Sequence, residues 1–329
     1  MNTIIKRTAA LAAALFFLLA LLPGCSVTVT DGGQTDGEKP LVVSTIFPQY
    51  DVVNNIAKET VRNELLIPYG TETHDFGVKD LTASRLETLH GASLIIAVGG
   101  ESDELLIKEL KTALAGSDVR FLLLTDLIKD LLNEEQTEGM EAETDGEDEE
   151  EIDEHVWTSP RRAAELARGI GRALCERFPA SRAEYEKNTE EYAGKLDELD
   201  VRYQETLKNR TYNTLIFADR FPFRYLCHDY GIEADAAFAG CSSSVDPSLA
   251  TLDHLYRKAK DLKLPAILCM EGSDPKYAKQ LASKTGGQAL MLHSCHIVSE
   301  EDAKKGYLGL LAYDLDVLKI ALGVREDAN

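Results

Sequence analysis

The chain twice repeats an alternation of short apolar runs with helical stretches, and one long helical stretch separates the two series. Strands that alternate with helices of about 10–15 residues are typical of βαβ units, whose strands are parallel. The dividing stretch, 181–208, holds no proline and a single glycine, Gly194. At about 1.5 Å per residue it predicts a helix of roughly 40 Å. The pattern therefore predicts an α/β fold of two four-stranded parallel-sheet lobes joined by a long rigid helix.

Eight short apolar runs are the expected strands of these lobes. They are 41–47, 64–69, 94–98 and 119–125 in the first series, and 214–218, 234–238, 266–270 and 289–292 in the second. We expect the N-terminal α/β lobe over 40–180, the linking helix over 181–209 and the C-terminal α/β lobe over 210–325. A last helix over 300–322 is expected to close the chain.

The N-terminus has the organisation of a secretory signal. The basic residues Lys6 and Arg7 precede an apolar core over 8–22, and a Leu-Pro-Gly-Cys run ends at Cys25. The apolar core is shorter than the about 20 residues that span a bilayer. The run that ends at Cys25 resembles a bacterial lipobox, whose cysteine is acylated and becomes the mature N-terminus. An ordinary cleaved signal with an incidental cysteine is the alternative.

The lipobox interpretation sets out the expected location of the protein. We expect a signal peptide over 1–24, a lipid on Cys25, and a flexible tether over 25–39, where Thr, Gly and Asp are prominent. Two or three acyl chains hold a protein to a membrane far more firmly than one. The rest of the chain is therefore expected outside the cytoplasm, anchored by its lipid to the outer face of the cell membrane.

Acidic residues dominate the charge of the chain. The formal net charge is −21, and the segment 133–154 alone holds thirteen acids. Because the chain has no basic face to attract phosphate groups, nucleic acid is excluded as a partner. Like charges this dense repel one another, so 133–154 is expected to be a disordered loop. The segment is either a solvated spacer or a weak collector of cations.

Five cysteines follow Cys25, and an odd number without paired spacing excludes a small disulfide scaffold. They are Cys175, Cys227, Cys241, Cys269 and Cys295. Cys241 and Cys295 both fall in loops that follow strands of the second lobe. Three roles stay open for this pair: a disulfide over the cleft, a thiolate that binds a metal, or two unpaired side chains.

Three histidines and an aspartate stand at expected element boundaries in both lobes. His74 follows the strand 64–69, His155 precedes a helix, and Asp219 and His293 come at the ends of strands. Ligands of open parallel sheets bind beyond the carboxyl ends of the strands. Three imidazoles and a carboxylate in one cleft would form a tetrahedral site suited to Zn²⁺.

Each of these residues also has an ordinary structural role open to it. An isolated histidine in a loop is commonly solvated, and Asp219 could instead accept backbone amides or pair with Arg220 or Arg224. His293 could be a partly buried residue whose ring is hydrogen-bonded to a neighbour. His296 lies in a short loop that could also reach the cleft.

Two motifs carry a resemblance to a known family. The stretch 73–80 resembles the Pro-His-Asp motif of the metal-binding lipoproteins of zinc and manganese ABC importers, and 153–160 is similar to that family's Asp-Pro-His-Val-Trp-Leu-Ser-Pro run. The family's charged loop lies between the two motifs, and its long domain-linking helix follows them, both in the expected order. The resemblance implies the TroA-like fold, with a metal held between two lobes. It also implies delivery of that metal to a membrane permease driven by a separate ATPase.

The resemblance also implies a set of metal ligands. His74 and His155 match its first two ligands, Asp219 is the nearest candidate for the third, and His293 occupies the place of the fourth. Glu271 lines up with a family glutamate near the cleft and is a reserve ligand or a support for the ligands. Two further reserves are His296 and Cys295. A nitrogen-rich set favours Zn²⁺, and Mn²⁺ is the second choice because it prefers carboxylate oxygens.

These features predict a monomeric binding protein that captures Zn²⁺ and is not an enzyme. The alternative is a surface zinc-dependent hydrolase, which would keep an open coordination position for water. The chain has no His-Glu-x-x-His run, and no glutamate is clearly placed as a general base. A third possibility, a binder of an iron chelate or a vitamin, would line its cleft with aromatic and arginine side chains instead of histidines.

Overall fold

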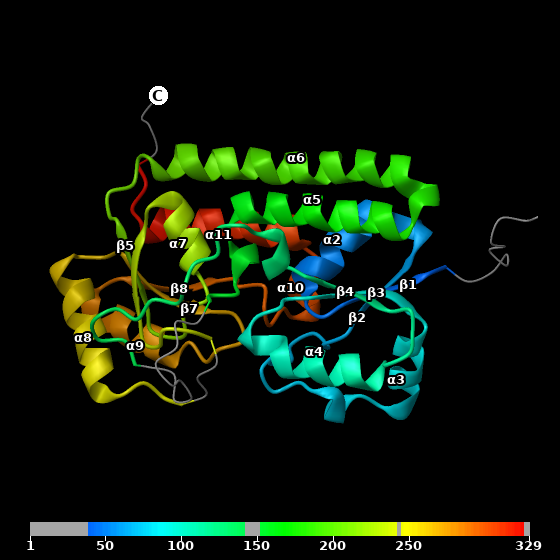
Figure 1. Ribbon diagram of the computed structural model, residues 1–329. Helices are drawn as coiled ribbons and strands as arrows, with labels where there is room; N and C mark the ends of the chain where they lie inside the picture. Colours follow the sequence, from blue (N-terminus) through cyan, green and yellow to red (C-terminus); the bar gives the residue numbers. More distant parts are fainter. Residues whose placement is uncertain (1–38, 142–151, 242–244, 326–329) are drawn as a thin grey trace, which may run out of the picture. The chain divides into compact units, whose positions relative to one another are not determined.

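The computed structural model describes residues 39–141, 152–241 and 245–325 (Figure 1). The expected signal peptide, the expected lipid site at Cys25 and the tether up to residue 38 lie outside the described residues. Among the helices of the described part, none combines the length and the apolar character needed to cross a bilayer.

The N-terminal sheet contains four parallel strands in the order β2-β1-β3-β4. These are β1 (Leu41–Ser44), β2 (Arg62–Leu65), β3 (Ala92–Ala97) and β4 (Arg120–Leu123). The central strand β1 is buried along its whole length. Continuous apolar runs suit such strands, because helices cover both faces of a parallel sheet. Around this sheet lie α2 (Phe47–Ala57), α3 (Ala83–His90) and α4 (Glu101–Ala113).

The C-terminal sheet repeats this topology, with four parallel strands in the order β6-β5-β7-β8. Its strands are β5 (Thr214–Phe217), β6 (Glu233–Ala236), β7 (Ala266–Met270) and β8 (Gln288–Leu292). The helices between and after them are α7 (Arg224–Tyr230), α8 (Leu249–Asp261), α9 (Lys276–Thr285), α10 (Glu300–Ala303) and α11 (Tyr307–Ala321). All eight expected strands are present, and the predicted α/β architecture of two sheets is confirmed.

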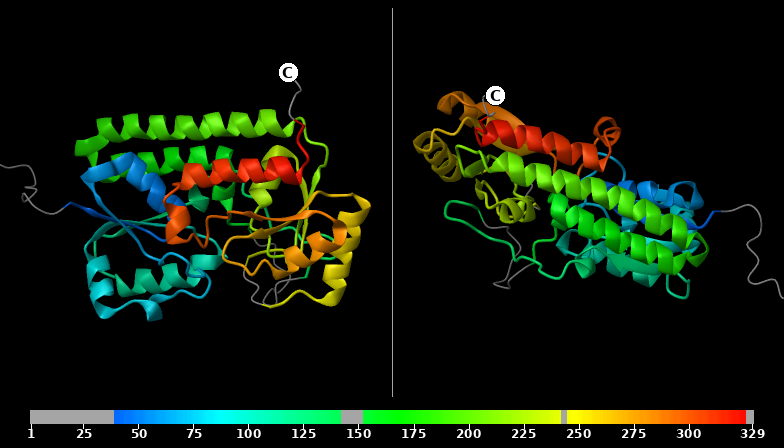
Figure 2. Two further views of the ribbon diagram at one scale, coloured as in Figure 1. Left: turned by 180° about the vertical axis from the view of Figure 1, so that it is seen from behind. Right: turned by 90° about the horizontal axis from the view of Figure 1, so that it is seen from above.

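A long helix joins the two lobes. This helix, α6 (Arg182–Leu207), has 26 residues and passes above α2 and α11 when the molecule is seen from behind (Figure 2). Its Tyr192 hydroxyl donates to Asp51 of α2 at 2.8 Å, and its Tyr203 hydroxyl donates to the Leu311 carbonyl of α11 at 2.5 Å. Beneath it lies α5 (Pro160–Arg177). Because α6 packs on helices of both lobes, it connects them as a rigid element.

The last helix differs from its expected extent. Instead of one helix over 300–322, the chain forms α10 and α11, with Gly306 between them at a φ of 71°. A positive φ lies outside the right-handed helical region, so the helix must end there. The break places Tyr307 in the core, where its hydroxyl donates to the Trp157 carbonyl.

The described ends of the acidic segment are bound to the second lobe, which differs from the disorder expected over 133–154. Glu141 pairs through its backbone with 237–239, and its carboxylate accepts from the Ser248 amide and the Thr251 hydroxyl, each at 2.6 Å. Asn133 forms a bridge with Ile152. These backbone and capping bonds order the ends although the sequence there is acidic. The residues between, 142–151, lie outside the described part.

Candidate metal centre

His74 enters the site from the loop that follows β2. Its Nε2 atom lies 2.8 Å from the Sγ atom of Cys241, which belongs to the loop after β6. The two residues come from different lobes, so their contact crosses the cleft between the sheets. Cys241 is 4% exposed, whereas His74 is half-buried and borders the opening of the cleft.

His155 stands just before α5, and its ring is fixed from one side. The Asp153 carboxylate accepts the His155 backbone amide at 2.8 Å and lies 3.2 Å from the ring Nδ1 atom. The opposite ring nitrogen, Nε2, is 3.0 Å from the Sγ atom of Cys241. A carboxylate behind an imidazole is a common way to aim the other nitrogen of the ring at a metal.

His296 completes the group from the loop that follows β8. Its ring centroid lies 5.6 Å from the rings of both His74 and His155. The Nε2 atom contacts the Thr73 hydroxyl, whereas the Nδ1 atom is buried without a hydrogen-bond partner. A buried polar atom without a partner is costly, and a metal ion is one group that would satisfy it.

Cys241 is common to both clusters in which donor atoms lie within 4.8 Å of one another. One cluster joins it to His74 and His296, and the other joins it to His155 and Glu154. Glu154 also accepts the Ser102 amide at 2.9 Å, and its second carboxylate oxygen is buried without a partner. The two groups of donor atoms, which together include three imidazoles and a carboxylate, therefore meet at the thiol of Cys241.

The electrostatics of the group differ from one imidazole to the next. Burial lowers the pKa of His155, but the negative charges of Cys241 and Asp153 together raise this pKa well above its usual range. Burial, followed by the nearby charges of His155 and His74, holds the pKa of His296 well below its usual range. His296 is therefore neutral at physiological pH and ready to donate an electron pair.

Asp219, the expected third ligand, lies near the site but makes other contacts. Its carboxylate accepts the Arg220 amide at 2.9 Å and the Met270 amide at 3.2 Å. It belongs to neither donor cluster found among the described residues. Arg220 in turn donates to Glu72 at 2.9 Å and to the Cys241 carbonyl at 2.8 Å. Asp219 thus supports the loops around the site by accepting backbone amides, one of the alternatives that the sequence left open.

His293, the expected fourth ligand, is also outside the two clusters. Its backbone amide donates to Asp314 at 2.9 Å, its Nδ1 atom is 3.4 Å from the same carboxylate, and its ring packs on Tyr313. Cys295 and Cys241 are both buried, and no disulfide joins them. Glu271 is buried and accepts hydrogen bonds from the loop that carries His296.

The sequence predicted two of the four converging residues as ligands, and named the other two only as alternatives. His296 was a reserve ligand, and a thiolate was one of three roles left open for Cys241 and Cys295. The available signal was position: both residues follow strands of the second sheet on the side of the cleft. Which residue of a short loop faces inward depends on local turns, and these have no periodic pattern.

A cavity of about 430 Å³ opens beside the site, between the lobes. His74 and Glu72 line it from the first lobe, and Arg220 lines it from the second. Carboxylates outnumber basic groups along its walls: Glu72, Asp75, Asp219, Asp246 and Asp274 against Arg220 and Lys276. An acidic wall raises the local concentration of cations.

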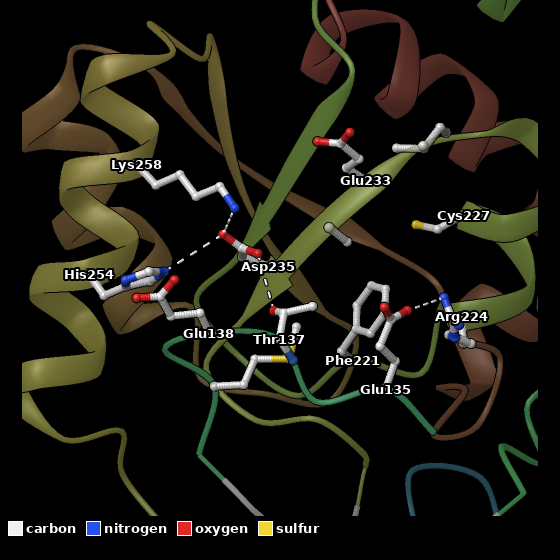
Figure 3. Close-up of a pocket in the computed structure, with 13 residues that line it drawn as sticks. Glu135, Thr137, Glu138, Phe221, Arg224, Cys227, Glu233, Asp235, His254 and Lys258 are labelled. Carbon is white, nitrogen blue, oxygen red and sulfur yellow. Dashed lines mark hydrogen bonds and ion pairs between the residues drawn. The ribbon is translucent and has the colours of Figure 1, made fainter. Parts of the chain in front are cut away.

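A second cavity, of about 410 Å³, lies on the outer side of the C-terminal sheet (Figure 3). Two ion pairs lie in it. Lys258 contacts Asp235, the Thr137 hydroxyl donates to Asp235 at 3.2 Å, and Arg224 lies 2.5 Å from Glu135. These pairs stabilise the contact of the acidic segment with the second lobe.

Sequence comparison shows relatives along nearly the whole chain. The family model described as zinc-uptake complex component A, periplasmic (ZnuA), matches residues 42–321. The high-affinity zinc uptake system protein ZnuA of Bacillus subtilis is 30% identical over 95% of this chain and 97% of its own length. The zinc-binding lipoprotein AdcA of Streptococcus pneumoniae is 29% identical over 89% of this chain, which spans 58% of the length of AdcA.

Comparison with solved structures gives the same kind of relatives. The Zn(II)-bound ZnuA-like domain of Streptococcus pneumoniae AdcA is 27% identical, with a TM-score of 0.69 over 86% of this chain and 99% of that domain. The periplasmic zinc-binding protein TroA of Treponema pallidum, 24% identical, has a TM-score of 0.71 over 86% of this chain and 99% of its own. The second likeness shows the TroA-like fold.

Proposed function

The chain belongs to the ZnuA family of periplasmic zinc-uptake components, and from this membership we propose that it captures Zn²⁺ outside the cytoplasm and delivers it to the membrane permease of an ABC importer. The observation that carries the proposal is the convergence of His74, His155, His296 and Cys241 between the two lobes. In this reading Zn²⁺ is the cargo of the protein. A separate ATPase would drive the permease.

The proposed ligands are the three imidazoles and the thiolate of Cys241. Zinc favours four nitrogen and sulfur ligands in a tetrahedron, and both kinds of donor are present. The buried Nδ1 atom of His296, which has no hydrogen-bond partner, supports the assignment. Asp153 supports it as well, since it orients His155 toward Cys241. This set replaces the expected Asp219 and His293.

A binding role suits these donors better than a hydrolytic one. A catalytic zinc normally keeps one position open for water, whereas four protein donors would close the coordination sphere. The thiolate also favours Zn²⁺ over Mn²⁺, because soft sulfur ligands bind manganese poorly. The lipid on Cys25 and the tether that follows remain part of the proposal, and would keep the protein beside its permease at the outer face of the membrane.

Zinc titration of the chain without residues 1–24 tests the proposed ligands. We expect one Zn²⁺ per chain, and a loss of affinity in His155→Ala and Cys241→Ala that exceeds the about 10–100-fold cost of changing a residue that only supports a ligand. Asp219→Asn is the matched control, since it alters a nearby carboxylate that contacts backbone amides, and it should lose less. Full affinity in Cys241→Ala would refute the ligand set.

Cobalt substitution gives a second readout. Co²⁺ bound to a thiolate shows a charge-transfer band in the near ultraviolet. We expect this band in the unchanged protein and in Asp219→Asn, and its disappearance in Cys241→Ser. A band that persisted in Cys241→Ser would show that a sulfur other than that of Cys241 binds the metal.

A further inference from the structure

Glu271 lies at the end of β7 and is 3% exposed. A buried carboxylate is costly unless hydrogen bonds or a cation compensate its charge. The donors to Glu271 all come from one short loop, 294–297. The proposed function gives this loop a role, because it carries His296.

The hydrogen bonds divide between the two carboxylate oxygens. Oε2 accepts the Ser294 amide at 2.6 Å. Oε1 accepts the Ser294 hydroxyl at 2.8 Å, the His296 amide at 3.0 Å and the Ile297 amide at 3.3 Å. Three backbone N–H groups of the loop therefore point at one side chain.

The backbone of the loop has the form that such a cluster of amides requires. Cys295 has a φ of 60°, in the left-handed region that a non-glycine residue seldom adopts. Successive N–H groups around a left-handed residue form a concave nest that binds anions. Here the anion is the chain's own carboxylate. From the other side, the Trp157 indole donates to the Ser294 carbonyl at 2.7 Å and holds the loop against the first lobe.

We propose that Glu271 is a positioning residue for zinc capture: its carboxylate holds the loop 294–297 in the conformation that turns His296 toward His74 and His155. This inference rests on the proposed function, because it requires His296 to be a ligand. Glu271 itself does not contact the metal. The sequence had placed it near the cleft without distinguishing a ligand from a support.

The carboxylate cannot be exchanged for an amide without loss. A carboxylate only accepts hydrogen bonds, and its two oxygens meet four donors here. In Glu271→Gln, one oxygen becomes an NH₂ group that faces N–H groups of the loop. The unmade bonds and the donor–donor contacts would favour another loop conformation, and His296 would then lose its place.

A double-mutant cycle in zinc affinity tests the proposal. We expect Glu271→Gln to weaken zinc binding by about 10–100-fold, the range for residues that orient a metal ligand. His296→Ala should weaken it at least as much. The double variant should bind no more weakly than His296→Ala alone, because without the imidazole there is nothing left for Glu271 to position. The cobalt–thiolate band should persist throughout, since Cys241 is unchanged.

Asp235→Asn is the matched control. Asp235 is also a buried carboxylate of the second lobe, but it faces the outer cavity, where it contacts Thr137 and Lys258 (Figure 3). We expect this variant to lower the thermal midpoint while zinc affinity stays unchanged. If Glu271→Gln does not fold, Glu271→Asp, which keeps the charge and shortens the side chain, replaces it in the same cycle.

The outcomes separate this inference from the proposed function. Losses in Glu271→Gln and His296→Ala that add in the double variant would overturn the positioning role, while the ligand set would stand. Unchanged zinc affinity in His296→Ala would overturn the ligand set and the positioning role with it. Loss of affinity in Asp235→Asn as large as in Glu271→Gln would show general destabilisation and would also overturn the inference.

Discussion

At the scale of single residues, the proposed ligand set gives Cys241 the choice of which metals the site would accept. Its sulfur lies within 3.0 Å of the ring nitrogens of both His74 and His155, so any ion between these rings must also meet the thiolate. Thiolates select zinc and other soft cations, whereas Mn²⁺ favours oxygen. As a proposed ligand, the thiolate would therefore also select zinc over manganese.

We expect Cys241→Asp to narrow the preference for zinc over manganese. The substitution supplies a hard oxygen donor where the sulfur lay, so it weakens zinc binding and improves manganese binding relative to zinc. Competition between the two ions, followed by elemental analysis of the bound metal, measures the ratio. A ratio equal to that of the unchanged protein would contradict the role of the thiolate.

The raised pKa of His155 gives zinc binding a pH dependence. Although burial lowers this pKa, the charges of Cys241 and Asp153 raise it well above its usual range, which favours a proton on His155 in the metal-free chain. Zn²⁺ must displace that proton, so affinity rises with pH below the pKa and falls on acidification, by up to about tenfold per pH unit for each proton displaced. Titration at about pH 7 and about pH 5 measures the difference, and equal affinities would contradict histidine ligation.

Residues within a multi-residue motif were easier to place in the site than residues chosen only for their position at the end of a strand. His74 and His155 stand in runs of several recognisable residues, and each lies in one of the two donor clusters that share Cys241. Asp219 and His293 were chosen for their position at strand ends, but such a position fixes only the neighbourhood of a side chain. Backbone amides bind Asp219, and Asp314 binds His293. His296 depends on a left-handed turn at Cys295, which the sequence did not indicate.

At the scale of elements, α5 and α6 each contain a glycine, and only one of the two bears on the close packing of these helices. Gly194 lies within α6, and a Cβ atom there would meet nothing within 4 Å. Gly171 lies within α5, and a Cβ atom there would overlap the Thr189 hydroxyl of α6. Gly194 therefore only lowers the stability of its helix, whereas Gly171 permits the close contact between the two helices.

We expect Gly194→Ala to raise the free energy of unfolding by about 0.5–1 kcal/mol, because alanine loses less conformational freedom in a helix. Gly171→Ala should lower it, since Thr189 or the helix must move. Urea unfolding of both variants measures the two changes. If Gly171→Ala were as stabilising as Gly194→Ala, the close contact between Gly171 and Thr189 would be contradicted.

The strands were easier to predict than their surroundings. Apolar runs such as 41–47 and 266–270 indicated parallel strands because both faces of such a sheet are buried. The break at Gly306 and the ordered ends of the acidic segment were missed, since tertiary contacts determine both. Tyr307 reaches Trp157 only because the last helix breaks. Glu141 is ordered only because α8 donates a hydrogen bond to its carboxylate and 237–239 pairs with its backbone.

At the scale of the whole described molecule, α6 limits how the lobes can move. It is bonded to α2 through Tyr192 and to α11 through Tyr203. Near the site, the ion pair between Glu72 and Arg220 adds a further connection. A rigid connection on one side and several bonds across the cleft favour small local rearrangements on binding instead of hinge closure.

Hydrogen exchange with and without Zn²⁺ checks this expectation. Amides of α6 should show the same protection in both states, because the helix does not rearrange. Amides of the four segments that carry the proposed ligands, around His74, His155, Cys241 and His296, should gain protection when the metal fixes them. A large zinc-dependent change in α6 would indicate that the lobes move as hinged bodies.

The indole that braces the His296 loop has one more consequence. Trp157 is the only tryptophan in the chain, it is fully buried, and its ring centroid lies 5.2 Å from that of His155 and 5.6 Å from that of His296. The protein therefore carries a built-in optical probe at the place where its cargo arrives. Its intrinsic fluorescence should follow the loading and unloading of the metal in real time, without any label attached.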